Sequence, residues 1–281
     1  MPACKFSLLS ALDLTVLIVY FLLLQIVGFV AGRRQKNAAD YFAAEHSLPW
    51  WAVTASIVAA ETSSLTFISI PGMAYAGNLT FMQLAFGYVL GRIVVATVFL
   101  PAYFKGNMET VYAFLEHRFS LNMRRMAAVL FQITRMLGTG VRLFATAIPL
   151  SLLTGWSFAT SIMIFAALTI PYTLFGGIRA VVWGELLQMG IYLSGAFAAL
   201  FVLNSSGVSL ASAGAAKFEM ISSGLNQGFV SFFTQPFHLA AGLIGGALLA
   251  ISSHGTDQLI VQRSLSCRNL RDAQKAMITS V

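Results

Sequence analysis

Charged residues and cysteines are both scarce in this sequence. Lys, Arg, Asp and Glu make up 10% of the 281 residues, whereas 58% are hydrophobic and the mean hydropathy is +0.79. A single water-soluble core cannot bury this much apolar surface, so the composition excludes an ordinary soluble domain and predicts a membrane protein. The only two cysteines, Cys4 and Cys267, lie at opposite ends of the chain without metal-ligand spacing, and we interpret both as structural.

Signatures of catalysis are also missing. The sequence contains no nucleophile–base pair, no metal-ligand cluster and no phosphate-binding loop, and Gly176-Gly177 is a turn signal without a preceding strand. The apolar runs are continuous rather than alternating, which excludes an outer-membrane barrel. We therefore expect an all-α membrane protein that is not an enzyme.

Seven apolar runs are long enough to span a bilayer, which takes about 20 apolar residues in a helix. The first run is too long for a signal peptide, and its basic cluster follows it rather than precedes it, so we interpret it as a spanning helix. The predicted spans are 12–31, 50–76, 81–104, 126–152, 159–175, 181–203 and 237–261.

Basic residues gather in alternate connections between these spans, a distribution that argues against a nucleic-acid surface despite the net charge of +7. With the first basic cluster in the cytoplasm, twelve Lys and Arg residues lie inside and two outside. The sequence thus predicts a multi-pass protein of the cell membrane with its N-terminus outside. Arg92, Arg135 and Arg142 fall within spans, where an arginine costs about 2.5–3.5 kcal/mol near the membrane centre, so we expect them to face protein or water.

Two connecting segments have helical features of their own. The cytoplasmic segment 107–125 has apolar residues at helical spacing and is predicted to form an interfacial helix. The outer segment 204–235 is rich in Ser, Gly and Ala, and a short helix is predicted at 215–221.

The second span, 50–76, is unusually rich in small and hydroxyl-bearing residues. Pro71-Gly72 removes a backbone donor near its outer end, so we expect this helix to be interrupted within the membrane. An unwound turn exposes carbonyl oxygens, and interrupted helices at the midplane are the usual cation sites of secondary transporters. The alternative is that the small residues only allow neighbouring helices to pack closely.

Glu61 lies in the middle of that span. A carboxylate there binds a cation or a proton, pairs with an arginine, or stays protonated. Arg135 and Arg142 are seven residues apart, hence on one helix face, and are candidate partners for a carboxylate. The alternative for these arginines is that one of them extends toward the cytoplasm.

The last predicted span ends in a second polar interruption at 252–258. Here Ser253 and His254 stand beside Gly255, where a side chain at a helix break could touch a solute. The alternative is that His254 is a polar group satisfied by its neighbours.

Five ordered segments resemble the sodium:solute symporter family: 40–51, the small-residue second span, 109–119, 172–188 and 256–276. The resemblance implies a leucine-transporter-type inverted-repeat fold in a single transmembrane domain covering 1–281. In that fold, 12–31 is an extra N-terminal helix, 50–203 the first five-helix repeat and 237–261 the first helix of the second repeat. The resemblance implies that the chain is truncated there.

The resemblance also implies site residues. Main-chain oxygens of Ala59 and Thr62 would form half of a sodium site, and Glu185 resembles the family's cytoplasmic sodium-exit carboxylate, although Gly184-Glu185 stands where Thr-Asp is common. Sugar carriers have a neutral amide at the position of Glu61, and their substrate pattern is not matched here, which disfavours glucose-like solutes. The substrate-binding candidates are Glu61, Thr66, Ser253 and His254.

The expected function is secondary symport, in which inward sodium movement drives uptake of a small solute by alternating access. Sodium would be the coupling ion and no other cofactor is expected. Two alternatives stay open from the sequence: the membrane sensor module of a signalling histidine kinase, and a truncated chain that is inactive on its own.

Overall fold

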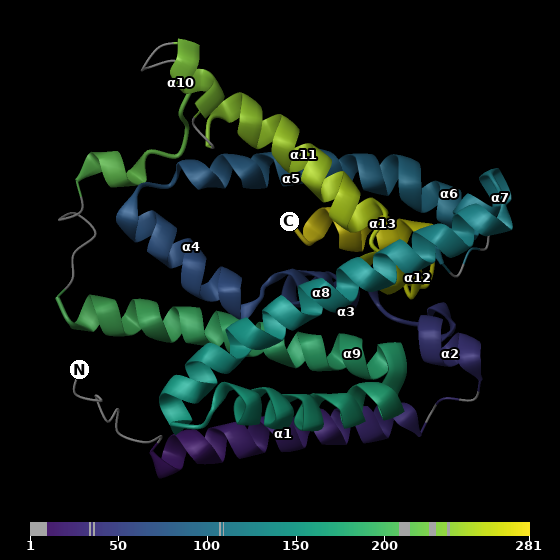
Figure 1. The fold of residues 1–281 in the computed structure, drawn as a ribbon, viewed down its shortest axis with the longest axis horizontal. Helices are drawn as coiled ribbons and strands as arrows, with labels where there is room; N and C mark the ends of the chain where they lie inside the picture. Colours follow the sequence, from purple (N-terminus) through teal and green to yellow (C-terminus); the bar gives the residue numbers. More distant parts are fainter. Residues whose placement is uncertain are drawn as a thin grey trace.

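The computed structural model is almost entirely helical and describes residues 10–33, 35, 37–106, 108, 110–207, 214–224, 229–234 and 237–281 (Figure 1). Cys4 lies outside this part of the chain. Within it, five helical stretches are long and apolar enough to cross a membrane. They are Ala11–Gly32, Thr80–Lys105, Leu121–Thr154, Phe158–Ser205 and Phe232–Gly255.

The predicted second span is broken into two helices, α3 (Trp50–Glu61) and α4 (Ser64–Ala76). Thr62 between them is extended, with φ −76° and ψ 99°. The hydroxyl of Ser63 then accepts a hydrogen bond from the amide of Thr66 at 3.3 Å and starts α4 afresh. The expected interruption is confirmed, but its expected cause is wrong, because Pro71 lies inside α4.

The next stretch runs through α5 (Gln83–Val94), a π-helical turn η3 (Val95–Phe99) and α6 (Leu100–Lys105). It packs along α11 (Leu239–Gly255), and Figure 1 shows the two side by side. Backbones touch at this contact: a Cβ added to Gly87 would lie 2.3 Å from the carbonyl oxygen of Gly242. Small residues therefore allow α5 and α11 to approach closely.

The long helix α8 (Leu121–Thr154) precedes α9 (Phe158–Ser205), which contains two of the predicted spans. Gly177 has φ 56° and ψ −157°, a conformation that favours glycine, and the chain reverses there (Figure 1). We call the parts of α9 before and after Gly177 its first and second arms. The first arm packs on α1 (Ala11–Gly32), where the side-chain amide of Gln25 donates to the carbonyl of Leu168 at 2.6 Å.

The second polar interruption is also confirmed. Helix α11 ends at Gly255, and α12 (Gln258–Leu265) begins after Asp257, whose Oδ1 accepts from the amide of Leu259 at 2.8 Å. Helix α13 (Leu270–Thr279) follows. The main buried cluster lies where α3, η3, α6, α12 and α13 meet, so one half of each interrupted helix packs in the core.

The remaining elements are short: α2 (Ala38–Ala43), η1 (Ala44–His46), η2 (Thr80–Met82), α7 (Val111–Arg118), η5 (Ala215–Phe218) and α10 (Phe229–Thr234). The predicted interfacial helix 107–125 is too long. Only α7 forms, because Phe119 leaves helical geometry at φ −126° and ψ −82°, and the end of the segment belongs to α8; Asn107 and Glu109 lie outside the described residues. The short outer helix forms as η5 but ends three residues earlier than expected.

Candidate functional site

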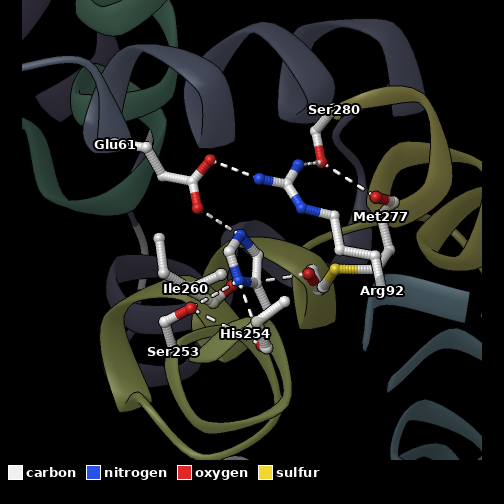
Figure 2. Close-up of polar contacts among 9 residues, drawn as sticks. Glu61, Arg92, Ser253, His254, Ile260, Met277 and Ser280 are labelled. Carbon is white, nitrogen blue, oxygen red and sulfur yellow. Dashed lines mark hydrogen bonds and ion pairs between the residues drawn. The ribbon is translucent and has the colours of Figure 1, made fainter. Parts of the chain in front are cut away.

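The two helix interruptions meet at one cluster of polar side chains (Figure 2). Glu61 is the last residue of α3, and His254 is the next to last of α11. Oε1 of Glu61 contacts Nε2 of His254, and Oε2 accepts a hydrogen bond from Nη2 of Arg92. The side chains of Arg92 and His254 are each 2% exposed, against 33% for Glu61. Both oxygens of this carboxylate are therefore engaged by protein nitrogens.

Arg92 extends from α5 and joins the cluster to the C-terminal segment. Its Nη1 donates to the hydroxyl of Ser280 at 2.6 Å, and that hydroxyl donates to the carbonyl of Met277 at 2.9 Å. The sequence proposed Arg135 and Arg142 as candidate carboxylate partners, whereas the arginine that meets Glu61 is Arg92. The only sequence signal for it was its position inside a span, which predicted that it faces protein.

His254 is held from its other side by its own helix. Its Nδ1 lies 2.8 Å from the hydroxyl of Ser253 and 3.2 Å from the carbonyl oxygen of Ala250. Three of the four substrate-binding candidates, Glu61, Ser253 and His254, thus come together. Thr66 does not join them: it is exposed, and its amide and hydroxyl both contact Ser63.

Ala59 and Thr62 lie at the end of α3. Ala59 is 5% exposed, and the amide of Thr62 donates to the carbonyl of Val58 at 2.9 Å. The last four carbonyls of a helix have no donor within that helix. The main-chain oxygens expected to bind sodium therefore lie at a helix end, where carbonyl oxygens receive no hydrogen bond from the same helix.

A tyrosine not foreseen from the sequence fixes the second interruption. The hydroxyl of Tyr103 donates to the carbonyl of Gly255 at 2.7 Å, at the point where α11 ends. A Cβ added to Gly255 would lie 3.3 Å from side-chain atoms of Val95 and Phe99, which belong to the π-helical turn. Single π-helical turns are frequent at functional sites, and here the turn accommodates the end of α11. No local pattern in the sequence marks such a turn.

Glu185, on the second arm of α9, lies in a separate cluster. Its carboxylate binds Arg263 of α12 through two contacts, Nη2 to Oε1 at 2.5 Å and Nε to Oε2 at 3.0 Å. The hydroxyl of Ser56 on α3 also donates to Oε2. The side chains of Arg263 and Glu185 are 9% and 12% exposed. The expected sodium-exit residue is thus an ion-pair partner that links α9 to both interrupted helices.

A cleft of about 370 Å³ opens between α8 and the α11–α12 break. Arg135 and Arg142 line it from α8, together with Asp257 and Ser253. Nη1 of Arg135 contacts Oδ2 of Asp257 at 3.3 Å. The interpretation that Arg135 pairs with a carboxylate is therefore confirmed, with Asp257 as the partner.

Comparison with known proteins assigns this architecture to a family. Residues 41–281 match the profile of the sodium:solute symporter family. The chain belongs to the sodium:solute symporter family. This family member is 31% identical to a sodium/glucose cotransporter of Vibrio parahaemolyticus, over 96% of its own length and 52% of that protein. It is 29% identical to the sodium/sialic acid symporter NanT of Aliivibrio fischeri, over 96% and 54%.

The chain is 27% identical to a human sodium-coupled monocarboxylate transporter, over 88% of its own length and 40% of that protein. Among solved structures, the substrate-bound outward-open state of a Na+-coupled sialic acid symporter matches with a TM-score of 0.77 and 25% identity, covering 96% of this chain and 56% of that one. The chain therefore spans about half the length of the relatives it matches. These relatives are transporters rather than enzymes, and sodium is the ion that their names carry.

Proposed function

We propose that this chain takes part in sodium-coupled symport, in which sodium moving inward drives uptake of a small solute by alternating access. The observation that carries the proposal is the meeting of two interrupted helices at Glu61 and His254. Interrupted helices that face each other supply main-chain oxygens and helix ends for ions and solute in secondary transporters. Membership of the family supports the same function.

The sodium half-site of this proposal consists of the main-chain oxygens of Ala59 and Thr62, beside the first interruption. Glu61 is not a simple ligand in it, since Arg92 and His254 occupy both carboxylate oxygens. In this proposal Glu185 binds the sodium ion during its release to the cytoplasm. For that role it must exchange Arg263 for sodium, because the arginine contacts both of its oxygens in this structure.

The proposed topology has seven spans with the N-terminus outside. Helix α9 contributes two, since it reverses at Gly177, and α3 with α4 contribute one. Residues 12–31 form the extra N-terminal helix, 50–203 the first repeat of a leucine-transporter-type fold, and 237–261 the first helix of the second repeat. Inward movement of one sodium charge across 100 mV supplies about 2.3 kcal/mol, before any concentration gradient.

Reconstitution in liposomes tests this function. The purified chain should accumulate a labelled solute when sodium is outside and should stop doing so when potassium replaces it. The panel of solutes is glucose, sialic acid and pyruvate, a monocarboxylate, after the solute classes in the names of the relatives. A bulky Ala59→Phe change should abolish sodium-driven accumulation, whereas Ala199→Phe, at an exposed position on α9, should preserve it. Folded protein without any sodium-dependent accumulation would overturn the proposal for this chain.

A further inference from the structure

We propose that Gln274 is a positioning residue: its side-chain amide replaces a backbone donor that Pro101 lacks, and it thereby holds the π-helical turn η3. Through that turn Gln274 sets the directions of Arg92 and Tyr103. These two side chains bind the ends of the interrupted helices α3 and α11. The effect on ion binding rests on the proposed function above, whereas the effect on the turn rests on its hydrogen bonds.

The π-helical turn leaves the carbonyl of Ala96 without a donor in its own helix. The amide of Leu100, which an α-helix would direct to Ala96, donates instead to the carbonyl of Val95. The amide that a further π-helical bond would use is that of residue 101, which is a proline and has no N–H. Ala96 is fully buried. A buried carbonyl without a donor is costly, so this one needs a partner from elsewhere.

Gln274 supplies that donor from another helix. Its Nε2 donates to the carbonyl oxygen of Ala96 at 2.9 Å, across 178 residues of sequence. Gln274 belongs to α13, which packs against α5, η3 and α6. Its neighbours Ala273 and Met277 are fully buried in the main core. The donor is therefore fixed in place by a packed helix.

This hydrogen bond favours one of two registers of the helix. In a continuous α-helix Leu100 would donate to Ala96, and the carbonyl without a donor would be that of Thr97, four residues before Pro101. In the π-helical register Gln274 satisfies the carbonyl in question. A proline alone does not produce a π-helical turn, because three others lie inside α-helices: Pro71, Pro149 and Pro171. Gln274 is what distinguishes this turn from those helices.

The register determines how α5 and α6 face the interrupted helices. One extra residue in a helix turns the residues after it by about 100° relative to those before it. Arg92 lies before the turn and binds Glu61, whereas Tyr103 lies after it and donates to the carbonyl of Gly255 at 2.7 Å. A return to the α-helical register would therefore turn the hydroxyl of Tyr103 away from Gly255.

The turn also packs directly on the end of α11. A Cβ added to Gly255 would lie 3.3 Å from side-chain atoms of Val95 and Phe99. The adjacent residue, His254, contacts Glu61 at the end of α3. A change of register would alter this packing together with the hydrogen bond of Tyr103. Gln274 thus acts on the meeting point of the two interrupted helices through the backbone of η3.

A double-mutant cycle with Pro101 tests this role. Gln274→Met keeps an unbranched side chain without the donor, and it should lower the thermal unfolding midpoint of the purified chain in detergent by about 2–4 °C. Pro101→Ala restores a backbone N–H, so Gln274→Met should cost little in that background. Gln274→Lys keeps a donor and should lower the midpoint less. The matched control is Gln262→Met, which removes an exposed amide-to-carbonyl hydrogen bond with Phe42 and should leave the midpoint unchanged.

Two further measurements separate positioning from stability. Spin labels at Leu90 and Lys105, exposed sites on either side of the turn, are attached in a background without the native cysteines. Their separation should change in Gln274→Met and stay the same in Gln274→Lys. In liposomes, Gln274→Met should raise the sodium concentration for half-maximal accumulation by about threefold or more, and Gln274→Lys should raise it less.

Several results would overturn the inference. An equal loss of midpoint in the two backgrounds would show that Gln274 only packs, and an unchanged label separation in Gln274→Met would show that it does not hold the turn. Unchanged sodium dependence in folded Gln274→Met would remove its effect on the ion site. If Gln274→Met alone does not fold, folding of the double variant with Pro101→Ala supports the role, and failure of both to fold contradicts it.

These results differ from a failure of symport. Sodium-driven accumulation by the unmodified chain, together with equal losses in the cycle, would leave the proposed function standing and remove this inference. Rescue by Pro101→Ala and a changed label separation, in a chain that accumulates nothing, would uphold the hold of Gln274 on the turn and remove the proposed function.

Discussion

Glu61 and His254 end two different helices and contact each other through Oε1 and Nε2. The two interruptions are thereby joined by a direct polar contact, and Arg92 holds the carboxylate from its other oxygen (Figure 2). The ends of the two interrupted helices therefore touch directly through these side chains.

Glu61→Gln should destabilise the folded chain. The change leaves the guanidinium of Arg92, which is 2% exposed, without its carboxylate partner, and breaking such a pair costs about 3 kcal/mol. Thermal unfolding followed by circular dichroism in detergent should show a lower midpoint. Glu219→Gln is the control, since it removes an exposed carboxylate whose contact is with Asn78, and it should leave the midpoint in place. Cation-dependent uptake should weaken in Glu61→Gln as well; unchanged ion dependence would remove Glu61 from the ion pathway.

Gly246→Ala should weaken the packing of α5 against α11. The added Cβ would lie 2.4 Å from the carbonyl oxygen of Leu84, which forces the helices apart and costs about 1–3 kcal/mol. The neighbouring Gly245 has no atom within 4 Å of such a Cβ. Gly245→Ala should therefore be neutral or stabilising by up to about 1 kcal/mol through helix propensity. Equal unfolding midpoints for the two variants would contradict the close contact of these helices.

Glu185 and Arg263 should be strongly coupled in a double-mutant cycle. The single changes Glu185→Gln and Arg263→Gln each leave a nearly buried charge unpaired, whereas the double change removes both charges, so we expect a coupling free energy of about 2 kcal/mol. The reference pair is Arg124 and Glu116, whose side chains are 44% and 38% exposed. Its coupling should stay below about 1 kcal/mol. Comparable coupling in both cycles would argue that the Glu185 pair is solvated.

The thiol of Cys267 should be unreactive in the folded chain. Burial, with a smaller contribution from Asp272, raises the pKa of Cys267 to about 12. A raised pKa keeps the thiol protonated at ordinary pH, and the thiolate is the reactive form. Maleimide labelling of a Cys4→Ser variant, measured by mass spectrometry, should be slow at pH 8 and rapid after unfolding. Ile278→Cys in a background without the native cysteines provides an exposed thiol for comparison. Rapid labelling of folded Cys267 at pH 8 would show that this segment opens.

The features that the sequence predicted well are those that depend on local chemistry. The apolar runs include the five helical stretches that are long and apolar enough to cross a membrane. The polar stretches around Thr62 and Asp257 identified both interruptions, because Ser63 and Asp257 cap the helices that restart there. Pro71 is not the cause of the first interruption, because it lies inside α4. A helix within a membrane protein tolerates proline when neighbouring groups satisfy the freed carbonyl, so the proline did not decide where the helix ended.

The features that were missed depend on distance in the folded chain. Nothing near Arg92 in the sequence indicates that it meets Glu61, since the contact joins α5 to the end of α3, between residues 31 positions apart in the chain. The contact of Tyr103 is equally invisible in the sequence, because its partner is a backbone carbonyl 152 residues away. The pairing of Arg263 with Glu185 has no local signal either, because it follows from the return of the second arm of α9. Charge and burial indicate that such residues need partners, but the packing of the helices determines which partner each residue contacts.

The cluster at Glu185 has a consequence for how the chain can move. The same carboxylate holds Ser56, in the N-terminal half of one interrupted helix, and Arg263, in the C-terminal half of the other. A cation arriving at Glu185 would compete with both at once. Binding of the ion would then release α3 and α12 from the second arm of α9 in a single event, rather than in two independent displacements.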